Sequence, residues 1–136
     1  MQLKRYTDYA LRIMVCLEER LKRDRSLQGV PAPDVIAAAG IPIVSFNRIC
    51  GLLEEHRLIY RKISRANEVR LYPGENFKKQ SLLSVAEAVE GNMDVFAVFD
   101  RQSSVVQMYE SKLFEVQRKM YRELSGVTIA KLAGER

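Results

Sequence analysis

The stretch that decides the fold is residues 34–72, DVIAAAGIPIVSFNRICGLLEEHRLIYRKISRANEVRLY. Its first part predicts a short helix over residues 35–39, with Asp34 as the N-cap and Gly40 in the left-handed conformation that ends many helices. Pro42 suits the first turn of a longer helix that runs to about residue 55. A short helix, a glycine-containing turn and a longer helix make the helix-turn-helix pattern.

Two predicted β-strands follow this pattern directly, over residues 58–63 and 68–72. The four residues between them, Ser64 to Asn67, predict a hairpin turn in which Asn67 is best able to take a positive φ. A helix-turn-helix followed by a hairpin is a winged helix-turn-helix. We therefore expect a mostly α fold with a small β-hairpin.

The segments around this stretch are predicted to be helical. Residues 6–23 carry apolar side chains at spacings of three and four, with Thr7 or Asp8 as the cap, and a polar loop with Gly29, Pro31 and Pro33 follows. Residues 81–90 predict a helix that starts at Ser81 or Ser84 and is followed by Gly91. Beyond it, residues 103–124 predict a long helix.

An apolar stripe along the long helix is the candidate dimer interface. Its members, at spacings of three and four, are Val106, Tyr109, Leu113, Val116, Met120 and Leu124. The alternative is that the stripe packs back on its own domain. We expect residues 1–79 to form a DNA-binding domain and residues 80–136 a helical segment for dimerisation or sensing.

Charge is divided unevenly between these two parts. Residues 1–79 hold 15 Lys/Arg against 9 Asp/Glu, a formal charge of +6, and residues 80–136 hold 7 against 8, a formal charge of −1. A basic first part suits a polyanion such as DNA, and a solvated basic surface is the alternative. No apolar run approaches the roughly 20 residues that a membrane span needs, and no signal peptide is visible, so we expect a cytoplasmic protein.

The second helix of the helix-turn-helix carries the candidate base-contacting residues. If Phe46 and its apolar neighbours face the core, helical geometry turns four side chains outward: Val44, Ser45, Asn47 and Arg48. Arginine can bind guanine through two donors, and asparagine can pair with adenine. Ser45 and Asn47 as ordinary polar surface are the alternative.

The predicted wing carries the candidate phosphate contacts. Its basic residues include Arg61, Lys62, Arg65 and Arg70, whose charges would neutralise phosphates or, alternatively, protect a solvated hairpin edge. Arg65 at the turn suits a narrow minor groove. Further backbone candidates lie on the first helix: Lys4, Arg5, Tyr9 and Arg12.

The residue types that catalysis or a metal would need are scarce. His56 is the single histidine of the sequence, and a capping or surface role suits it. No phosphate-binding, dinucleotide or nucleophile-elbow motif is present. Cys50 falls on the inner side of its helix and Cys16 beside the apolar stripe of the first helix, so both are expected to act as small apolar residues rather than redox sensors. We therefore expect no enzyme, no metal and no cofactor.

Four segments together resemble the Rrf-type transcriptional regulators, the group of IscR, NsrR and CymR. They are residues 1–12, MQLKRYTDYALR; residues 40–53, GIPIVSFNRICGLL; residues 82–91, LLSVAEAVEG; and residues 126–132, GVTIAKL. The resemblance implies a winged helix, a long helix that crosses to a partner subunit, and a homodimer on a palindromic promoter site. It also implies base contacts at Ser45, Asn47 and Arg48.

The chain departs from the family pattern in two places. Cluster-binding members carry three cysteines in the segment that corresponds to residues 92–112, where this chain has none, so we expect no iron–sulfur cluster. The family's glycine-rich wing is replaced by residues 63–70, ISRANEVR, in which Glu68 would repel phosphate. The loss of the glycines changes the turn, which argues against insertion of the wing into the minor groove.

We therefore expect a homodimeric, sequence-specific DNA-binding regulator, a repressor in its simplest form. The alternative is a member of the family that has lost specific DNA binding and acts as a protein-interaction partner. A small-molecule or protein effector is expected near residues 92–105, where Met93, Phe96 and Phe99 would line a pocket or, alternatively, join the dimer core.

Overall fold

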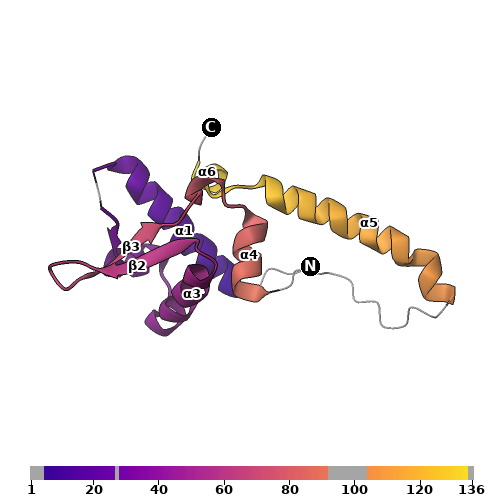
Figure 1. Ribbon diagram of the computed structural model, residues 1–136, viewed down its shortest axis with the longest axis horizontal. Coiled ribbons are helices and arrows are strands. Elements are labelled where there is room, and N and C mark those ends of the chain that lie inside the picture. Colours follow the sequence, from indigo (N-terminus) through magenta and orange to yellow (C-terminus); the bar gives the residue numbers. More distant parts are fainter. Residues whose placement is uncertain (1–4, 27, 92–103, 135–136) are drawn as a thin grey trace.

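The computed structural model describes residues 5–26, 28–91 and 104–134 (Figure 1). A body of short helices and a small sheet carries one long helix, α5, which extends away from it. In chain order the elements are α1 (Arg5–Arg23), β1 (Val30–Pro31), α2 (Ala32–Ala39), α3 (Ile43–Glu55), β2 (Ile59–Ile63), β3 (Val69–Pro73), the 3₁₀ helix η1 (Phe77–Lys79), α4 (Leu82–Glu90), α5 (Ser104–Gly126) and α6 (Ile129–Leu132). The predicted winged helix-turn-helix is confirmed.

The sheet has one strand more than the predicted hairpin. Its order is β1-β3-β2 with both pairs antiparallel, and β1 pairs Val30 with Leu71 and Pro31 with Arg70. The sequence predicts a loop over this segment, which is wrong for these two residues. Proline donates no ladder hydrogen bond, and Pro31 is accommodated because β1 is an edge strand.

The helix-turn-helix differs from expectation at the starts of its helices. α2 begins at Ala32 with Pro31 as its N-cap, so Asp34 is not the cap. Asp34 lies in the first turn, where its carboxylate suits the helix dipole and forms an ion pair with Arg20 at 3.3 Å. Pro42 is the N-cap of α3 rather than a first-turn residue. Gly40 ends α2 at φ 66°, which confirms its predicted left-handed role.

α1 begins one residue earlier than predicted, at Arg5, so that neither Thr7 nor Asp8 is its cap. Thr7 is fully buried, and both its backbone N–H and its hydroxyl donate to Oε1 of Glu90, at 3.1 and 3.2 Å. Glu90 is the last residue of α4, whose start is capped, as predicted, by Ser81. A carboxylate from α4 therefore accepts from one free N–H in the first turn of α1 and from the hydroxyl of the same residue, which joins the two helices.

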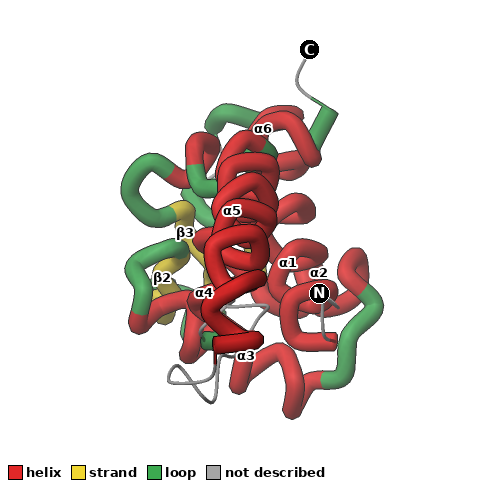
Figure 2. Tube along the Cα trace, turned by 90° about the vertical axis from the view of Figure 1, so that its right-hand side faces the viewer, coloured by secondary structure: helices red, strands yellow, loops and turns green. Residues whose placement is uncertain are grey.

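The core lies between α1, the helix-turn-helix, α4 and the inner face of the sheet. Its largest fully buried side chains come from all of these elements: Ile13, Met14, Leu17, Val30, Val35, Phe46, Ile49, Leu53, Ile59, Leu71, Val85 and Ile129. The short helix α6 adds Ile129 to it. Figure 2, viewed from the side toward which α5 extends, shows α6 and α3 at opposite ends of this body, with α5 in front of it.

No single helix in the described ranges has both the length and the apolar character that a membrane crossing requires. α2 and α3 pass such a test only as a pair, and they meet at a bend of 111°. Both helices contribute buried side chains to the core described above.

Candidate nucleic-acid interface

The first turns of α3 present the predicted base-contacting residues on the outer surface. The side chains on the opposite, inner face are Phe46, Ile49, Cys50 and Leu53, all buried. Because these side chains fix the rotation of the helix, Val44 is 83% exposed and both Asn47 and Arg48 are exposed. Ser45 is half-buried, so its hydroxyl is less accessible than the sequence analysis assumed.

Two of these side chains are held by neighbours from other elements. The guanidinium of Arg48 lies 5.4 Å from the ring centroid of Tyr6 on α1, a cation–π arrangement. Oδ1 of Asn47 accepts a hydrogen bond of 3.3 Å from Nη1 of Arg61 on β2, and Arg61 also forms an ion pair with Glu54. α1, α3 and β2 therefore position one polar surface.

The β2–β3 hairpin forms the wing as predicted. Asn67 takes a φ of 60°, and its N–H donates to the carbonyl of Ser64 at 2.9 Å, which closes the turn. Arg65 is exposed at the tip, and Nζ of Lys62 lies 5.3 Å from the ring centroid of Tyr72 on the neighbouring strand. Two cations of the wing, Lys62 on β2 and Arg65 in the turn, are thus exposed to solvent.

Arg70 occupies a different position from the other wing cations. Its side chain is only 21% exposed and forms an ion pair of 2.9 Å with Glu68. Nε and Nη2 also donate to the backbone carbonyls of Gln28 and Gly29, at 3.0 and 3.2 Å. Arg70 therefore ties the segment before β1 to the sheet, and it offsets the negative charge of Glu68 that sequence analysis expected to face phosphate.

Three exposed apolar side chains at this surface were missed by sequence analysis. Ile43, the first residue of α3, is 62% exposed. Ile63 and Val69 face one another across the end of the hairpin and are 70% and 40% exposed. The sequence did contain a signal for Ile63 and Val69, because they flank a polar turn. The ends of the two strands extend beyond the packed part of the sheet, so side chains on either face of the hairpin stay exposed there.

The candidates on α1 are only partly available for a phosphate. Lys4 lies outside the described residues, and Arg5 is exposed. Arg12 forms an ion pair with Asp8 at 2.9 Å and donates to the carbonyl of Ala39 at 3.3 Å. Its guanidinium also lies 5.5 Å from the ring centroid of Tyr9, so that these two candidates form one stacked unit.

The two cysteines and the histidine have roles in the structure of the protein, in packing and in helix capping. Burial raises the pKa of the Cys50 thiol to about 12, and burial also raises the pKa of Cys16. His56 is the C-cap of α3, with Nδ1 3.0 Å from the carbonyl oxygen of Leu52. Within the described ranges, no three His, Cys, Asp or Glu side chains lie close enough to hold a metal ion.

α5 carries the predicted dimerisation stripe on a helix of 23 residues. Tyr109 and Val116 are 44% and 47% exposed, and Leu113, Met120 and Leu124 are half-buried. Val106 lies in the helix, but its side chain is outside the described part of the structure. The predicted effector residues Met93, Phe96 and Phe99 also lie outside the described residues.

Comparison with solved structures shows the class of fold. CymR of B. subtilis, described as the global cysteine regulator, aligns over 100% of this chain and 98% of its own, with a TM-score of 0.78 and 13% identity. A putative transcriptional regulator of Listeria innocua aligns over 100% and 89%, with a TM-score of 0.73 and 12% identity. IscR of T. potens aligns over 97% and 85%, with a TM-score of 0.69 and 11% identity.

The chain therefore has the winged-helix fold of transcriptional regulators in the group that its sequence resembles. In comparisons of sequence, no family model matches the chain, and no curated protein matches it either.

Proposed function

We propose that this chain is a homodimeric, sequence-specific DNA-binding transcriptional regulator of the Rrf type, which acts in the cytoplasm as a repressor. The observation that carries the proposal is the surface formed by the first turns of α3 and the neighbouring wing. There, Asn47 and Arg48 are exposed and held by Arg61 and Tyr6, and Arg65 stands free of other described contacts at the wing tip.

In this proposal, α3 makes the contacts with the DNA bases. The second helix of a helix-turn-helix lies in the major groove, with its N-terminal residues at the base edges. Arg48 would bind guanine and Asn47 adenine, Val44 would contact a thymine methyl group, and Ser45 would contribute one hydroxyl. The ring of Tyr6 restricts Arg48 before binding, which lowers the entropy cost of ordering it on a base.

The wing and the first part of α1 would contact the DNA phosphates. Lys62 and Arg65 are exposed and Arg61 borders α3, so all three would lie along the DNA backbone. Arg5 and the stacked pair of Tyr9 and Arg12 would contact a second stretch of backbone. Arg70 is the weakest of the predicted contacts, because its donors are already used within the protein.

We assign dimerisation to α5, and the proposed regulator holds no iron–sulfur cluster. A dimer with one reading helix per subunit matches a palindromic site whose half-sites lie about one turn of DNA apart. The chain has two cysteines, neither of them between residues 92 and 112, and a cluster held by thiolates requires more ligands than these. A repressor needs no catalytic residue, since occupying a promoter is enough.

The decisive experiment is selection of bound duplexes from a random DNA pool by the purified protein at near-physiological salt. Enrichment of a two-fold symmetric site is the expected result. Arg48→Ala should then lose about 1–3 kcal/mol of discrimination at one base pair of each half-site. Arg23→Ala is the matched control, because Arg23 lies on the last turn of α1 with a side chain 76% exposed, and it should select the same site.

A pool that shows no enrichment would contradict specific readout and favour the protein-interaction alternative. Equal loss of affinity for all sequences in Arg48→Ala would instead assign Arg48 to a phosphate. A reporter placed behind the selected site tests repression: expression should rise when the protein is removed, and a fall would make the protein an activator.

A further inference from the structure

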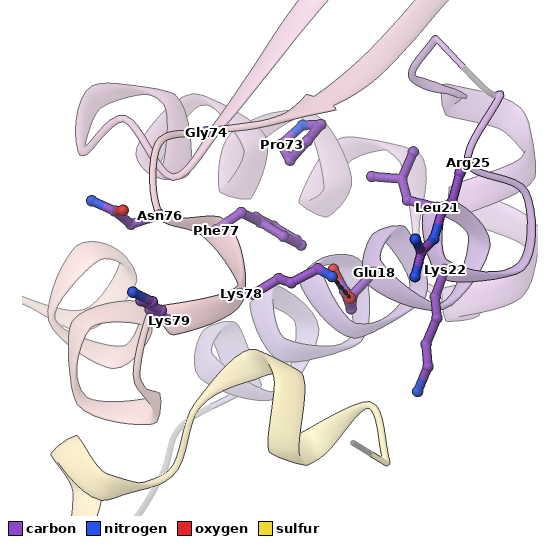
Figure 3. Close-up of a pocket in the computed structure, with 10 residues that line it drawn as sticks. All are labelled: Glu18, Leu21, Lys22, Arg25, Pro73, Gly74, Asn76, Phe77, Lys78 and Lys79. Atoms are coloured by element: carbon purple, nitrogen blue, oxygen red, sulfur yellow. Dashed lines mark ion pairs between the residues drawn. The ribbon is translucent and has the colours of Figure 1, made fainter. Parts of the chain in front are cut away.

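A cavity of about 590 Å³ lies between the C-terminal half of α1 and the segment that joins β3 to α4 (Figure 3). Residues from Glu18 to Arg25 form one wall, and residues 73–79 form the other. Volumes of roughly 300–1,000 Å³ are typical of sites for small molecules. Since these residues border α6, which lies opposite α3 in both overall views, the cavity is separate from the proposed DNA surface.

The lining combines apolar surface with positive charge. Leu21, Pro73 and the 5%-exposed ring of Phe77 supply the apolar part. Four cationic residues border it, Lys22, Arg25, Lys78 and Lys79, and Figure 3 shows the side chains of Lys22 and Lys79 at its outer edges. Lys22 and Arg25 form no ion pair with any residue in the described part of the chain, so their charges are available to a ligand.

Among the described residues that line the cavity, a single carboxylate opposes these four cations. The side chain of Glu18 is 6% exposed, and its Oε1 lies 3.7 Å from Nζ of Lys78, as the dashed line in Figure 3 marks. This distance is too long for a hydrogen bond, but the ion pair places the Lys78 ammonium beside the cavity. A buried carboxylate needs a compensating charge, so Lys78, whose side chain is 64% exposed, balances Glu18, and the other three cations are in excess.

We propose that this cavity binds a small organic anion with one acidic group and an apolar body. The apolar body would cover Leu21 and Phe77, and the acidic group would take hydrogen bonds from the excess cations, where charge-assisted bonds are strongest. A neutral molecule of the same shape would leave that excess positive charge unmatched. The site is distinct from residues 92–105, where sequence analysis expected an effector.

The test is an NMR titration of the full chain with indole-3-acetate and, separately, with its uncharged amide. The two probes have the same apolar ring and differ in one negative charge. Indole-3-acetate should shift the backbone amide signals of Lys22, Gly74, Phe77 and Lys79 in a saturable way. The uncharged amide should bind at least about tenfold more weakly, since several charge-assisted contacts are lost.

Two double variants separate this site from general attraction of anions. Lys22→Gln with Lys79→Gln should weaken binding of indole-3-acetate by about tenfold. Lys62→Gln with Arg65→Gln removes the same two charges from the wing and should leave binding unchanged. Intact spectra of both variants, outside the changed positions, show that each remains folded.

Three results would overturn the proposal. They are the absence of saturable shifts at the cavity up to millimolar probe, equal binding of the acid and its amide, and equal weakening by both double variants. None of these measurements contains DNA. Failure of the ligand site is therefore distinguishable from failure of the proposed regulator function, which the duplex selection tests separately.

Discussion

The body of the molecule buries its large apolar side chains, whereas α5 leaves several of its apolar side chains exposed. In the body, Ile13, Leu17 and Ile49 are fully buried, together with side chains from every major element. On α5, no described side chain is fully buried, and Met108 and Val116 are 81% and 47% exposed. The body therefore completes its core within one chain, whereas α5 does not.

The two regions therefore obtain their stability from different sources. Burial of apolar surface contributes about 25 cal/mol per Å², and an isolated helix has little stability of its own in water. A helix of 23 residues, about 35 Å long, that buries so little in its own chain needs another surface. We expect the stability of the body to be independent of protein concentration, and that of α5 to depend on assembly.

Phe46→Ala should produce the largest effect on the body side of this comparison. Phe46 is 2% exposed at the centre of the core and fixes the orientation of α3. Truncation of a buried phenylalanine costs about 3–5 kcal/mol, a large part of the stability of a small domain. Urea unfolding measures the loss. Val44→Ala, at an 83%-exposed position on the same helix, is the control and should cost less than about 0.5 kcal/mol.

Val116→Glu should disrupt dimerisation through α5 and leave the body intact. A carboxylate at this half-exposed apolar position would be buried without a partner in a dimer, which should weaken dimerisation by at least about 2 kcal/mol. Sedimentation velocity should then report a monomer, and circular dichroism should show a loss of helical content from α5 while the unfolding of the body is unchanged. Ser111→Glu introduces the same side chain on the opposite face of α5 and should remain dimeric. Dimerisation that survives Val116→Glu would contradict the assignment of the stripe.

The features that sequence analysis predicted correctly depend on local chemistry. Gly40 and Asn67 take the positive φ values expected of them, and Ser81 caps α4, because each requirement involves only neighbouring residues. The orientation of α3 was predictable for a similar reason, since apolar residues at helical spacing define one buried face.

The features that sequence analysis missed depend on residues far apart in the chain. β1 is two residues long and contains a proline, and it is a strand only because β3 lies beside it. Arg70 was predicted at the DNA surface, but its donors reach carbonyls of Gln28 and Gly29 about forty residues away. The stacking of Arg48 on Tyr6 joins two helices and leaves no signal in either one.

Cys50 should make the stability of the body depend on pH. Its pKa is raised by burial from an ordinary thiol value of 9.0 to about 12. Because the folded state holds this proton more tightly, its contribution is complete below pH 9 and is lost as the pH rises from 9 toward 12, by up to about 1.4 kcal/mol per pH unit. Urea unfolding between pH 8 and about pH 11 should show a smaller slope in Cys50→Ala than in the wild type. Equal slopes would mean that Cys50 titrates normally in the folded chain.

Ser81→Ala should have the smallest effect, at the joint between the two regions. The Ser81 hydroxyl accepts from the N–H of Ser84 at 3.1 Å, and loss of such a cap costs about 1 kcal/mol. The joint itself is made of backbone bonds, from Leu82 N–H to the carbonyl of Val127 and from Ile129 N–H to that of Gln80, which alanine keeps. Unfolding should therefore occur at lower urea while the sedimentation coefficient stays that of the dimer. If Ser81→Ala also dissociated the dimer, the position of α5 on the body, and not its exposed stripe, would control assembly.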